Sequence, residues 1–238
     1  MISYCGQRFH VGATFERPLN AFEYQLEWGR HLFSSCCQRL WGQYDVSMLH
    51  LHSTSPERWL QQVDASLNEI LIDHAHCEQK AAAAAMDLMF DYVVNEDLCK
   101  EMTEIVHEEL EHFHMVIELL KDRGVRFYKM KPGTYGRKLK QLARRQEPGK
   151  AVDRLLIAGL IEARSCERFL LLRDHLQDQQ LVEFYGSLYE SEARHHATYV
   201  RLAKQYGDSD EVDIRLDELA ADEAKIIEEG CELPRMHS

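Results

Sequence analysis

Proline and glycine are scarce in this chain of 238 residues, with 5 and 12 copies respectively. Both residues interrupt regular helices, and chains built from many short strands and turns usually need more of them. Alanine, leucine, glutamate and glutamine, which favour helices, are plentiful. The composition therefore predicts an all-α protein that is long enough to bury a substantial core.

Long apolar runs are also missing. No stretch approaches about 18 uninterrupted apolar residues, and the amino terminus lacks the charged-then-apolar pattern of a secretory signal. We therefore expect a soluble, cytoplasmic protein without membrane association. The seven cysteines are odd in number and include no Cys-x-x-Cys, so we expect neither a disulfide framework nor a zinc site.

Capping residues and glycines indicate where helices begin and end. Ser55 followed by Pro56 predicts a helix start, and Gly124 predicts a helix end. We expect a single domain over residues 1–238, in which residues 1–46 form an amino-terminal extension that is hard to assign. The predicted helices cover about 20–41, 55–92 with a break near Val63, 96–122, 137–146, 151–175, 179–206 and 210–229.

Four carboxylates and two histidines form a doubled pattern in the chain. A glutamate is followed 31 residues later by Glu-x-x-His in the first copy and 30 residues later in the second copy. The similar offsets suggest two similar pairs of helices, each contributing one carboxylate and one Glu-x-x-His. The residues are Glu78, Glu109 and His112 in the first copy, and Glu162, Glu192 and His195 in the second.

These six residues fall where apolar residues are expected. In the segment 98–119, the apolar stripe steps by four and three residues and passes through Glu109 and His112. Four carboxylates in a common core are tolerable only if protons or cations neutralise them. The pattern therefore predicts a carboxylate-bridged site for two iron or two manganese ions in a four-helix bundle, and spacing does not separate the two metals. Glu111 and His114, by contrast, lie on the opposite, polar face and should face solvent.

Charge is unevenly distributed along the chain. The net charge is −12, yet the segment 121–150 holds 11 Lys or Arg against two acids. One basic segment in an acidic protein suits a polyanionic ligand, although a solvated loop with an amphipathic helix has the same composition. Phe127, Tyr128 and Tyr135 could stack on bases there, or simply anchor the loop. The candidate basic contacts are Lys129, Lys131, Arg137, Lys138, Lys140, Arg144 and Arg145.

Several strings in the sequence resemble those of the MiaE family. The similarity covers roughly residues 47–238, and the closing segment 234–238 resembles the family's terminus. The strings that carry it are DHAHCE at 73–78, EELEHF at 108–113, IEARSCERF at 161–169 and SEARH at 191–195. Each of the four includes at least one of the six residues of the doubled pattern.

The resemblance implies a ferritin-like bundle with additional peripheral helices and a specific activity. Members of this family hydroxylate the isopentenyl group of 2-methylthio-N6-isopentenyladenosine at tRNA position 37, using dioxygen and two iron ions. The implied partners are the anticodon arm of tRNA, bound through the basic segment, and an external electron donor of the reductase or ferredoxin type. A manganese catalase and a ferritin-like iron oxidation or storage protein remain alternatives, because they use similar ligands.

The resemblance also implies a role for each ligand. One iron would be held by Glu78 and His112, the other by Glu162 and His195, with Glu109 and Glu192 as bridges. Many such oxygenases place an acid directly before each Glu-x-x-His to hydrogen-bond a ligand histidine on the partner helix; Glu108 fits this pattern and Ser191 does not. Other side chains could hydrogen-bond around the site or form ion pairs on a helix surface, namely Asp73, His74, Arg164, Glu167, Arg168 and Arg194.

Overall fold

The computed structural model describes residues 49–238. The helix predicted over about 20–41 and the extension 1–46 lie outside this range. The described part of the chain is helical, without strands, and this confirms the predicted all-α class. Its helices are α2 (Glu57–Asp91), α3 (Glu96–Asp122), α4 (Tyr135–Gln141), α5 (Gly149–His175), α6 (Gln179–Ala203) and α7 (Ser209–Glu229).

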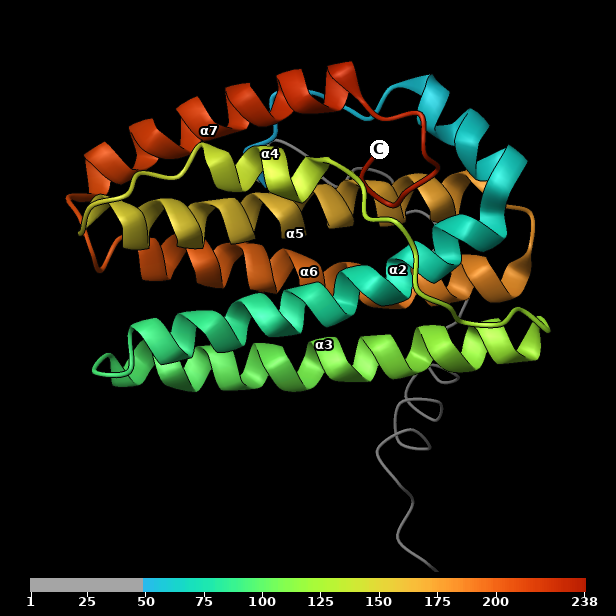
Figure 1. Cartoon of the computed structure of the whole chain (residues 1–238), viewed down its shortest axis with the longest axis horizontal. Helices are drawn as coiled ribbons and strands as arrows, with labels where there is room; N and C mark the ends of the chain where they lie inside the picture. The colour runs from blue at the N-terminus through green and yellow to red at the C-terminus, as the bar shows by residue number, and fades with distance from the viewer. Residues whose placement is uncertain (1–48) are drawn as a thin grey trace, which may run out of the picture. The chain divides into compact units, whose positions relative to one another are not determined.

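Two antiparallel helix pairs form a four-helix bundle. The helices α2 and α3 pack on each other, α5 and α6 pack on each other, and the two pairs lie side by side (Figure 1). The helices α4 and α7 pack against α5 from outside the bundle, as expected for peripheral helices. Within residues 49–238, no helix is both long and apolar enough to cross a membrane.

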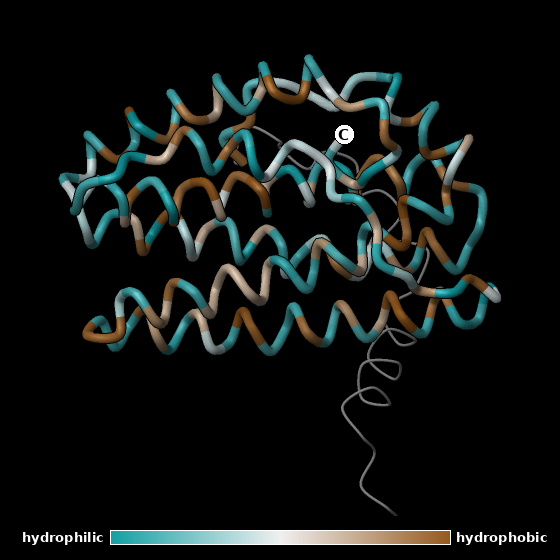
Figure 2. Tube along the Cα trace, viewed as in Figure 1, coloured by the Kyte–Doolittle hydropathy of each residue, from teal (hydrophilic) through white to brown (hydrophobic). Residues whose placement is uncertain are grey.

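The apolar core has two large clusters along the bundle, and a small third cluster is formed by Leu49, Ala163 and Cys166. One large cluster includes Leu88, Leu98 and Leu202, and the other includes Leu71 and Phe169. Apolar and polar positions alternate around each helix with the helical period, so every bundle helix turns an apolar stripe inward (Figure 2). In each of these helices, the predicted ligand positions fall between the residues of the first cluster and those of the second. The fold therefore encloses the candidate site with apolar side chains at both ends.

Local signals explain the helix boundaries. The side chain of Asn95 caps α3 by accepting from the backbone N–H of Leu98, and Gly124 ends this helix region with φ at +68°. The break in α2 lies at Ser66, one turn after the predicted position at Val63. The helix α6 ends at Ala203, before the predicted end, since the following residues form a turn.

Candidate metal centre

Six ionisable side chains meet between the two apolar clusters, and all four bundle helices contribute to them. All six are buried, and the most exposed of them, His112, has only 7% of its surface accessible. These are the six residues of the doubled sequence pattern, and the structure brings all of them together. They are Glu78 from α2, Glu109 and His112 from α3, Glu162 from α5, and Glu192 and His195 from α6.

The six side chains form two overlapping groups. In each group the possible ligand atoms lie within 4.8 Å of one another. Glu109 and Glu192 belong to both groups, so their carboxylates lie between the other four side chains. The first group is completed by Glu78 and His112, and the second by Glu162 and His195. Each group therefore offers three carboxylates and one imidazole, a suitable donor set for a divalent transition metal.

Several polar atoms of this cluster lack the hydrogen bonds that buried groups normally make. Within residues 49–238, both carboxylate oxygens of Glu109, one of Glu192, and Nδ1 of both histidines are buried without a hydrogen bond of good geometry. Nδ1 of His195 does approach Oε1 of Glu109, at 2.9 Å. Every ion pair found for the four carboxylates in this part of the chain is with a histidine, and none is with Lys or Arg. The residues thus fit a pair of cations.

Burial makes ionisation of three carboxylates unfavourable without such cations. Desolvation raises the pKa of Glu109 and of Glu162 well above their usual value, and neighbouring carboxylates raise both further. Desolvation also raises the pKa of Glu78, to about 8. In the metal-free protein these three groups are therefore largely protonated near neutral pH, and metal binding must release protons from them.

The fourth carboxylate and the histidines behave in the opposite way. Burial alone would raise the pKa of Glu192, but the nearby imidazoles of His112 and His195 outweigh burial and lower it. Burial would lower the pKa of His195, yet Glu108, Glu109 and Glu192 raise it well above the usual value. Protonated histidines therefore partly neutralise the metal-free cluster, and these protons too must leave when a metal binds.

Comparison with known proteins assigns the chain to a family. The family model described as tRNA-(MS[2]IO[6]A)-hydroxylase (MiaE) matches residues 44–238. The chain belongs to the MiaE family. One relative, the tRNA 2-(methylsulfanyl)-N(6)-isopentenyladenosine(37) hydroxylase of Pseudomonas putida, is 40% identical over 184 residues, which are 77% of this chain and 89% of the relative. The protein of the same name from Salmonella typhimurium is 30% identical over 209 residues, covering 67% and 77% of the two chains.

A solved structure shows the same fold. It is described as protein 43 with aldehyde deformylating oxygenase activity from Synechococcus. It aligns with a TM-score of 0.76 and 42% identity, over 79% of this chain and 95% of that chain. The fold of this MiaE-family chain is therefore a ferritin-like bundle, and the chain is a hydroxylase. These findings do not favour the catalase and iron-storage alternatives.

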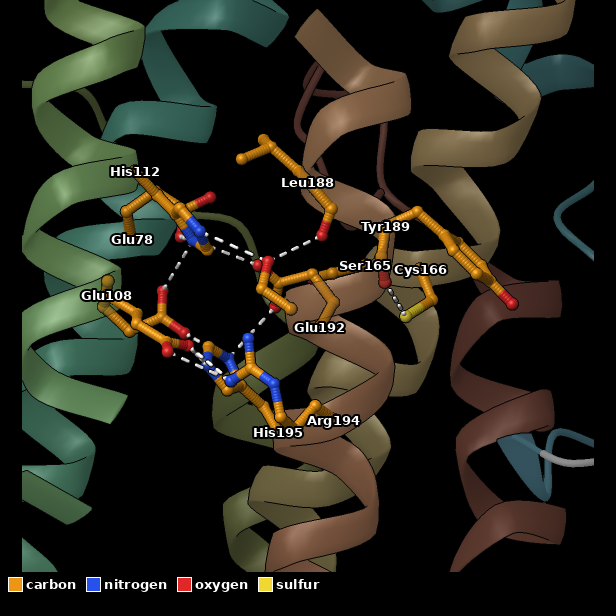
Figure 3. A network of polar contacts seen from close by, with 12 residues as sticks. Glu78, Glu108, His112, Ser165, Cys166, Leu188, Tyr189, Glu192, Arg194 and His195 are labelled. Atoms are coloured by element: carbon orange, nitrogen blue, oxygen red, sulfur yellow. Dashed lines mark hydrogen bonds and ion pairs between the residues drawn. The ribbon is translucent and has the colours of Figure 1, made fainter. Parts of the chain in front are cut away.

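The two histidines of the cluster contact different kinds of side chain through Nε2, the ring nitrogen that faces away from the cluster. Nε2 of His195 lies 2.6 Å from a carboxylate oxygen of Glu108, as the sequence pattern predicts (Figure 3). Nε2 of His112 lies 3.2 Å from the hydroxyl of Ser191, which stands where the pattern lacks an acid. Arg194 contacts Glu108 from the solvent side, at 2.7 Å. The His195 hydrogen bond is the largest cause of the lowered pKa of Glu108, about 2; burial opposes it and Arg194 adds to it.

The remaining predicted neighbours divide between two places. His74 is buried beside the cluster, with Nε2 at 2.5 Å from Glu78 Oε1 and its ring stacked on Tyr185. Asp73 instead accepts a hydrogen bond from the backbone N–H of Met236 in the carboxyl-terminal segment. The other three of these neighbours lie on the side of α5 that faces α7 and the carboxyl-terminal segment, and are Arg164, Glu167 and Arg168.

The basic segment of this MiaE-family chain is only partly available to a ligand. Lys138 pairs with Glu229, and Arg144 binds the buried carboxylate of Asp153 at 2.7 Å, so these two cations contribute to the fold. Five others are exposed and form no ion pair within residues 49–238, namely Lys129, Lys131, Arg137, Lys140 and Arg145. The aromatic residues also differ. Tyr128 is 49% exposed, whereas Tyr135 is buried and bonds Glu223, so Tyr135 anchors the loop.

Proposed function

We propose that this chain hydroxylates the isopentenyl group of 2-methylthio-N6-isopentenyladenosine at position 37 of tRNA, with dioxygen and two iron ions. The observation that supports this most directly is the pair of buried groups that share Glu109 and Glu192 in a MiaE-family chain. In this proposal Glu109 and Glu192 bridge the ions. The terminal ligands would be Glu78 and His112 for one ion, and Glu162 and His195 for the other.

The side chains of the cluster would bind the metals and exclude water. Four ionised carboxylates carry four negative charges, which two divalent cations balance, so the occupied core would be neutral. The apolar clusters at both ends keep bulk water away and hold the ligands in place. When bound, the iron pair supplies the redox chemistry that dioxygen requires.

The overall reaction requires an external electron donor. Hydroxylation places one oxygen atom of dioxygen in the new C–O–H group and reduces the other to water, which consumes two electrons and two protons. These two electrons would have to be supplied anew for each turnover. We therefore propose a separate reductase or ferredoxin as partner, and a cytoplasmic location, where tRNA is found.

The exposed part of the basic segment would bind the anticodon arm. Residues 125–134 run from the end of α3 across α2 towards α4 (Figure 1). The backbone carbonyl of Tyr128 bonds His76, two residues before Glu78. Lys129 and Lys131, which follow Tyr128 directly in the chain, therefore lie near the part of α2 that carries a proposed ligand. A polyanion bound there would bring its modified base near the metal cluster, once the base leaves the anticodon stack.

A reconstituted reaction tests the proposed activity. Reduced, iron-loaded protein is mixed with dioxygen and prenylated tRNA, and the nucleosides are analysed for the hydroxylated product. The Glu109→Ala variant should give no product, whereas Glu111→Ala, on the exposed face of the same helix, should react normally. A long-chain aldehyde serves as the competing substrate. Deformylation of the aldehyde without turnover of tRNA would contradict the proposal, as would vigorous oxygen release from peroxide by manganese-loaded protein.

Charge reversal tests the tRNA surface. Replacing Lys129, Lys131, Arg137 and Lys140 by glutamate should weaken tRNA binding and reduce the slope of log K against log salt by roughly one unit per lost phosphate contact. The control is Lys225→Glu on α7, where an exposed lysine pairs with Asp222 outside the segment. Equal affinity and equal salt slope in both variants would show that the segment is a solvated connector. Metal content should remain unchanged in both.

A further inference from the structure

The two halves of the cluster have similar candidate ligands, but the side chains that hydrogen-bond those ligands differ. Each half offers three carboxylates and one histidine, and two of the carboxylates are common to both. The histidines, however, have different partners at their outer nitrogen. His195 faces the carboxylate of Glu108 at 2.6 Å, and His112 faces the hydroxyl of Ser191 at 3.2 Å. Any difference in metal affinity between the halves must therefore come mainly from these side chains, which accept a hydrogen bond from Nε2 of each histidine.

Hydrogen-bond geometry fixes the direction of both outer contacts. The hydroxyl of Ser191 donates its proton to the backbone carbonyl of Leu188, at 2.7 Å, so its oxygen must accept from Nε2–H of His112. The carboxylate of Glu108 accepts from Nε2–H of His195. Both imidazoles therefore turn Nδ1 towards the cluster, where it lies 3.2 Å from Glu192 for His112 and 2.9 Å from Glu109 for His195.

An anionic acceptor and a neutral acceptor affect an imidazole differently. A hydrogen bond to a carboxylate is roughly twice as strong as one to a neutral oxygen, and it raises the basicity of the opposite ring nitrogen. Ser191 is the weaker acceptor of the two, because its oxygen is neutral and lies 3.2 Å from Nε2 of His112, whereas the Glu108 carboxylate lies 2.6 Å from Nε2 of His195. Nδ1 of His195 is consequently the stronger electron donor of the two. Arg194 reduces this effect without removing the negative charge of Glu108.

We infer that the two metal positions have unequal affinities, and that Ser191 is the positioning residue that sets the difference. The Glu162–His195 position binds a divalent cation first and more tightly, and the Glu78–His112 position binds second and exchanges its cation more readily. This inference rests on the ligand set proposed above. It also assigns the more accessible histidine to the weaker position, since His112 is exposed to 7% and His195 to 1%.

Stepwise titration of the metal-free full-length chain with Co²⁺ tests the inference, with calorimetry and visible absorption as readouts. The unmodified chain should show two steps whose dissociation constants differ by about 10-fold or more, since outer-partner changes typically alter metal affinity by about 10–100-fold. Ser191→Asp places a carboxylate behind His112 and should tighten the second step about 10-fold. Glu108→Gln should instead weaken the first step by about 10–100-fold.

A matched variant separates the hydrogen bond from the added charge. Ser187 lies one turn before Ser191 on the same helix, is exposed and donates to the carbonyl of Phe184. Ser187→Asp adds the same charge without reaching His112, so both steps should keep their affinities. In addition, His112→Ala should abolish only the second step and His195→Ala only the first, which assigns each step to its position.

The outcomes distinguish this inference from the proposed ligand set. Two equal steps in the unmodified chain, or equal effects of Ser191→Asp and Ser187→Asp, would overturn the inference and leave the ligand set intact. If Ser191→Asp does not fold, Glu108→Gln alone tests the inference. A weakened second step with an unchanged first step in that variant would contradict the assignment. No Co²⁺ binding by the folded unmodified chain would overturn the ligand set itself.

Discussion

Two clusters of buried charge lie on opposite faces of α5, and they are neutralised in different ways. Glu162 points into the bundle and joins the metal cluster. Arg164 and Glu167 lie on the other face, against α7 and residues 53–55. Arg164 and Glu223 are both fully buried, and their side chains form two hydrogen bonds of 2.8 Å. In this second cluster, which we call the arginine cluster, the chain supplies its own cations.

The contrast shows which buried acids indicate a metal. In the arginine cluster, burial would lower the pKa of Arg164, but Glu223 raises it above its usual value, so the ion pair stays charged. In the metal cluster, burial raises the pKa of Glu109 and Glu162, since no guanidinium or ammonium group lies among the six side chains. Burial of a carboxylate is therefore not sufficient evidence for a metal site. The lack of an arginine or lysine partner is the informative feature.

The largest expected effect comes from breaking the metal cluster at a shared carboxylate. Glu109→Ala or Glu192→Ala removes a side chain that belongs to both groups, so about two metal ions per chain should be lost. Glu111→Ala and His114→Ala alter exposed residues of the same helix and should leave the metal content unchanged. Metal analysis after reconstitution measures this. Equal loss in both sets would mean that the buried cluster is not the metal site.

Breaking the arginine cluster should affect stability rather than metal content. Glu223→Ala leaves the guanidinium of Arg164 buried without its main partner, which should lower the free energy of unfolding by about 3–5 kcal/mol. Urea unfolding of the metal-free protein measures this change. Asp217→Ala, which alters an exposed ion pair on the same helix, should cost less than about 1 kcal/mol. A small effect of Glu223→Ala would show that Arg164 finds other partners.

The comparison also explains what could be predicted from the sequence. The helices and the six clustered residues follow from local periodicity, because apolar stripes and caps are properties of single helices. Glu223 lies in the apolar stripe of α7, between Leu219 and Ile227. In the sequence it therefore looks like Glu109, which also stands at a position of an apolar stripe. The contact of Glu223 with Arg164 depends on how α7 packs against α5, which no local pattern encodes. The Ser191–His112 contact likewise depends on the register between α3 and α6.

The stability of the metal-free protein should depend on pH because of the metal cluster. The pKa of Glu78 is about 8 in the folded chain against a reference of 4.5, so the folded state binds more protons than the unfolded state between these values. Stability should therefore fall as pH rises from 7 to 8, where the buried His74 with its lowered pKa is neutral in both states, by at most about 1.4 kcal/mol per pH unit for each group with a raised pKa. The raised pKa of His195 acts in the same direction, since its contribution is lost as pH rises.

Thermal unfolding in the presence of a chelator measures this dependence. The unfolding temperature of the metal-free chain should fall steadily over this range, and saturating metal should remove or reverse the decline, because bound cations favour the ionised carboxylates. A rising unfolding temperature of the metal-free chain between pH 7 and 8 would contradict the idea that its buried acids are protonated.

The smallest expected effect comes from replacing one glutamate of the metal cluster by glutamine, and the same replacement in the arginine cluster serves as the comparison. Glutamine resembles a protonated glutamate in shape, and the pKa of Glu162 is raised well above its usual value. At pH 5, Glu162→Gln should therefore change the unfolding free energy of the metal-free protein by less than about 0.5 kcal/mol, and at pH 8 it should stabilise the protein, because the glutamate ionises on unfolding there and glutamine does not. Glu223→Gln should destabilise the protein at both pH values, because Arg164 requires a charged partner. If both glutamine variants responded alike, the two clusters would not differ in how their charge is neutralised.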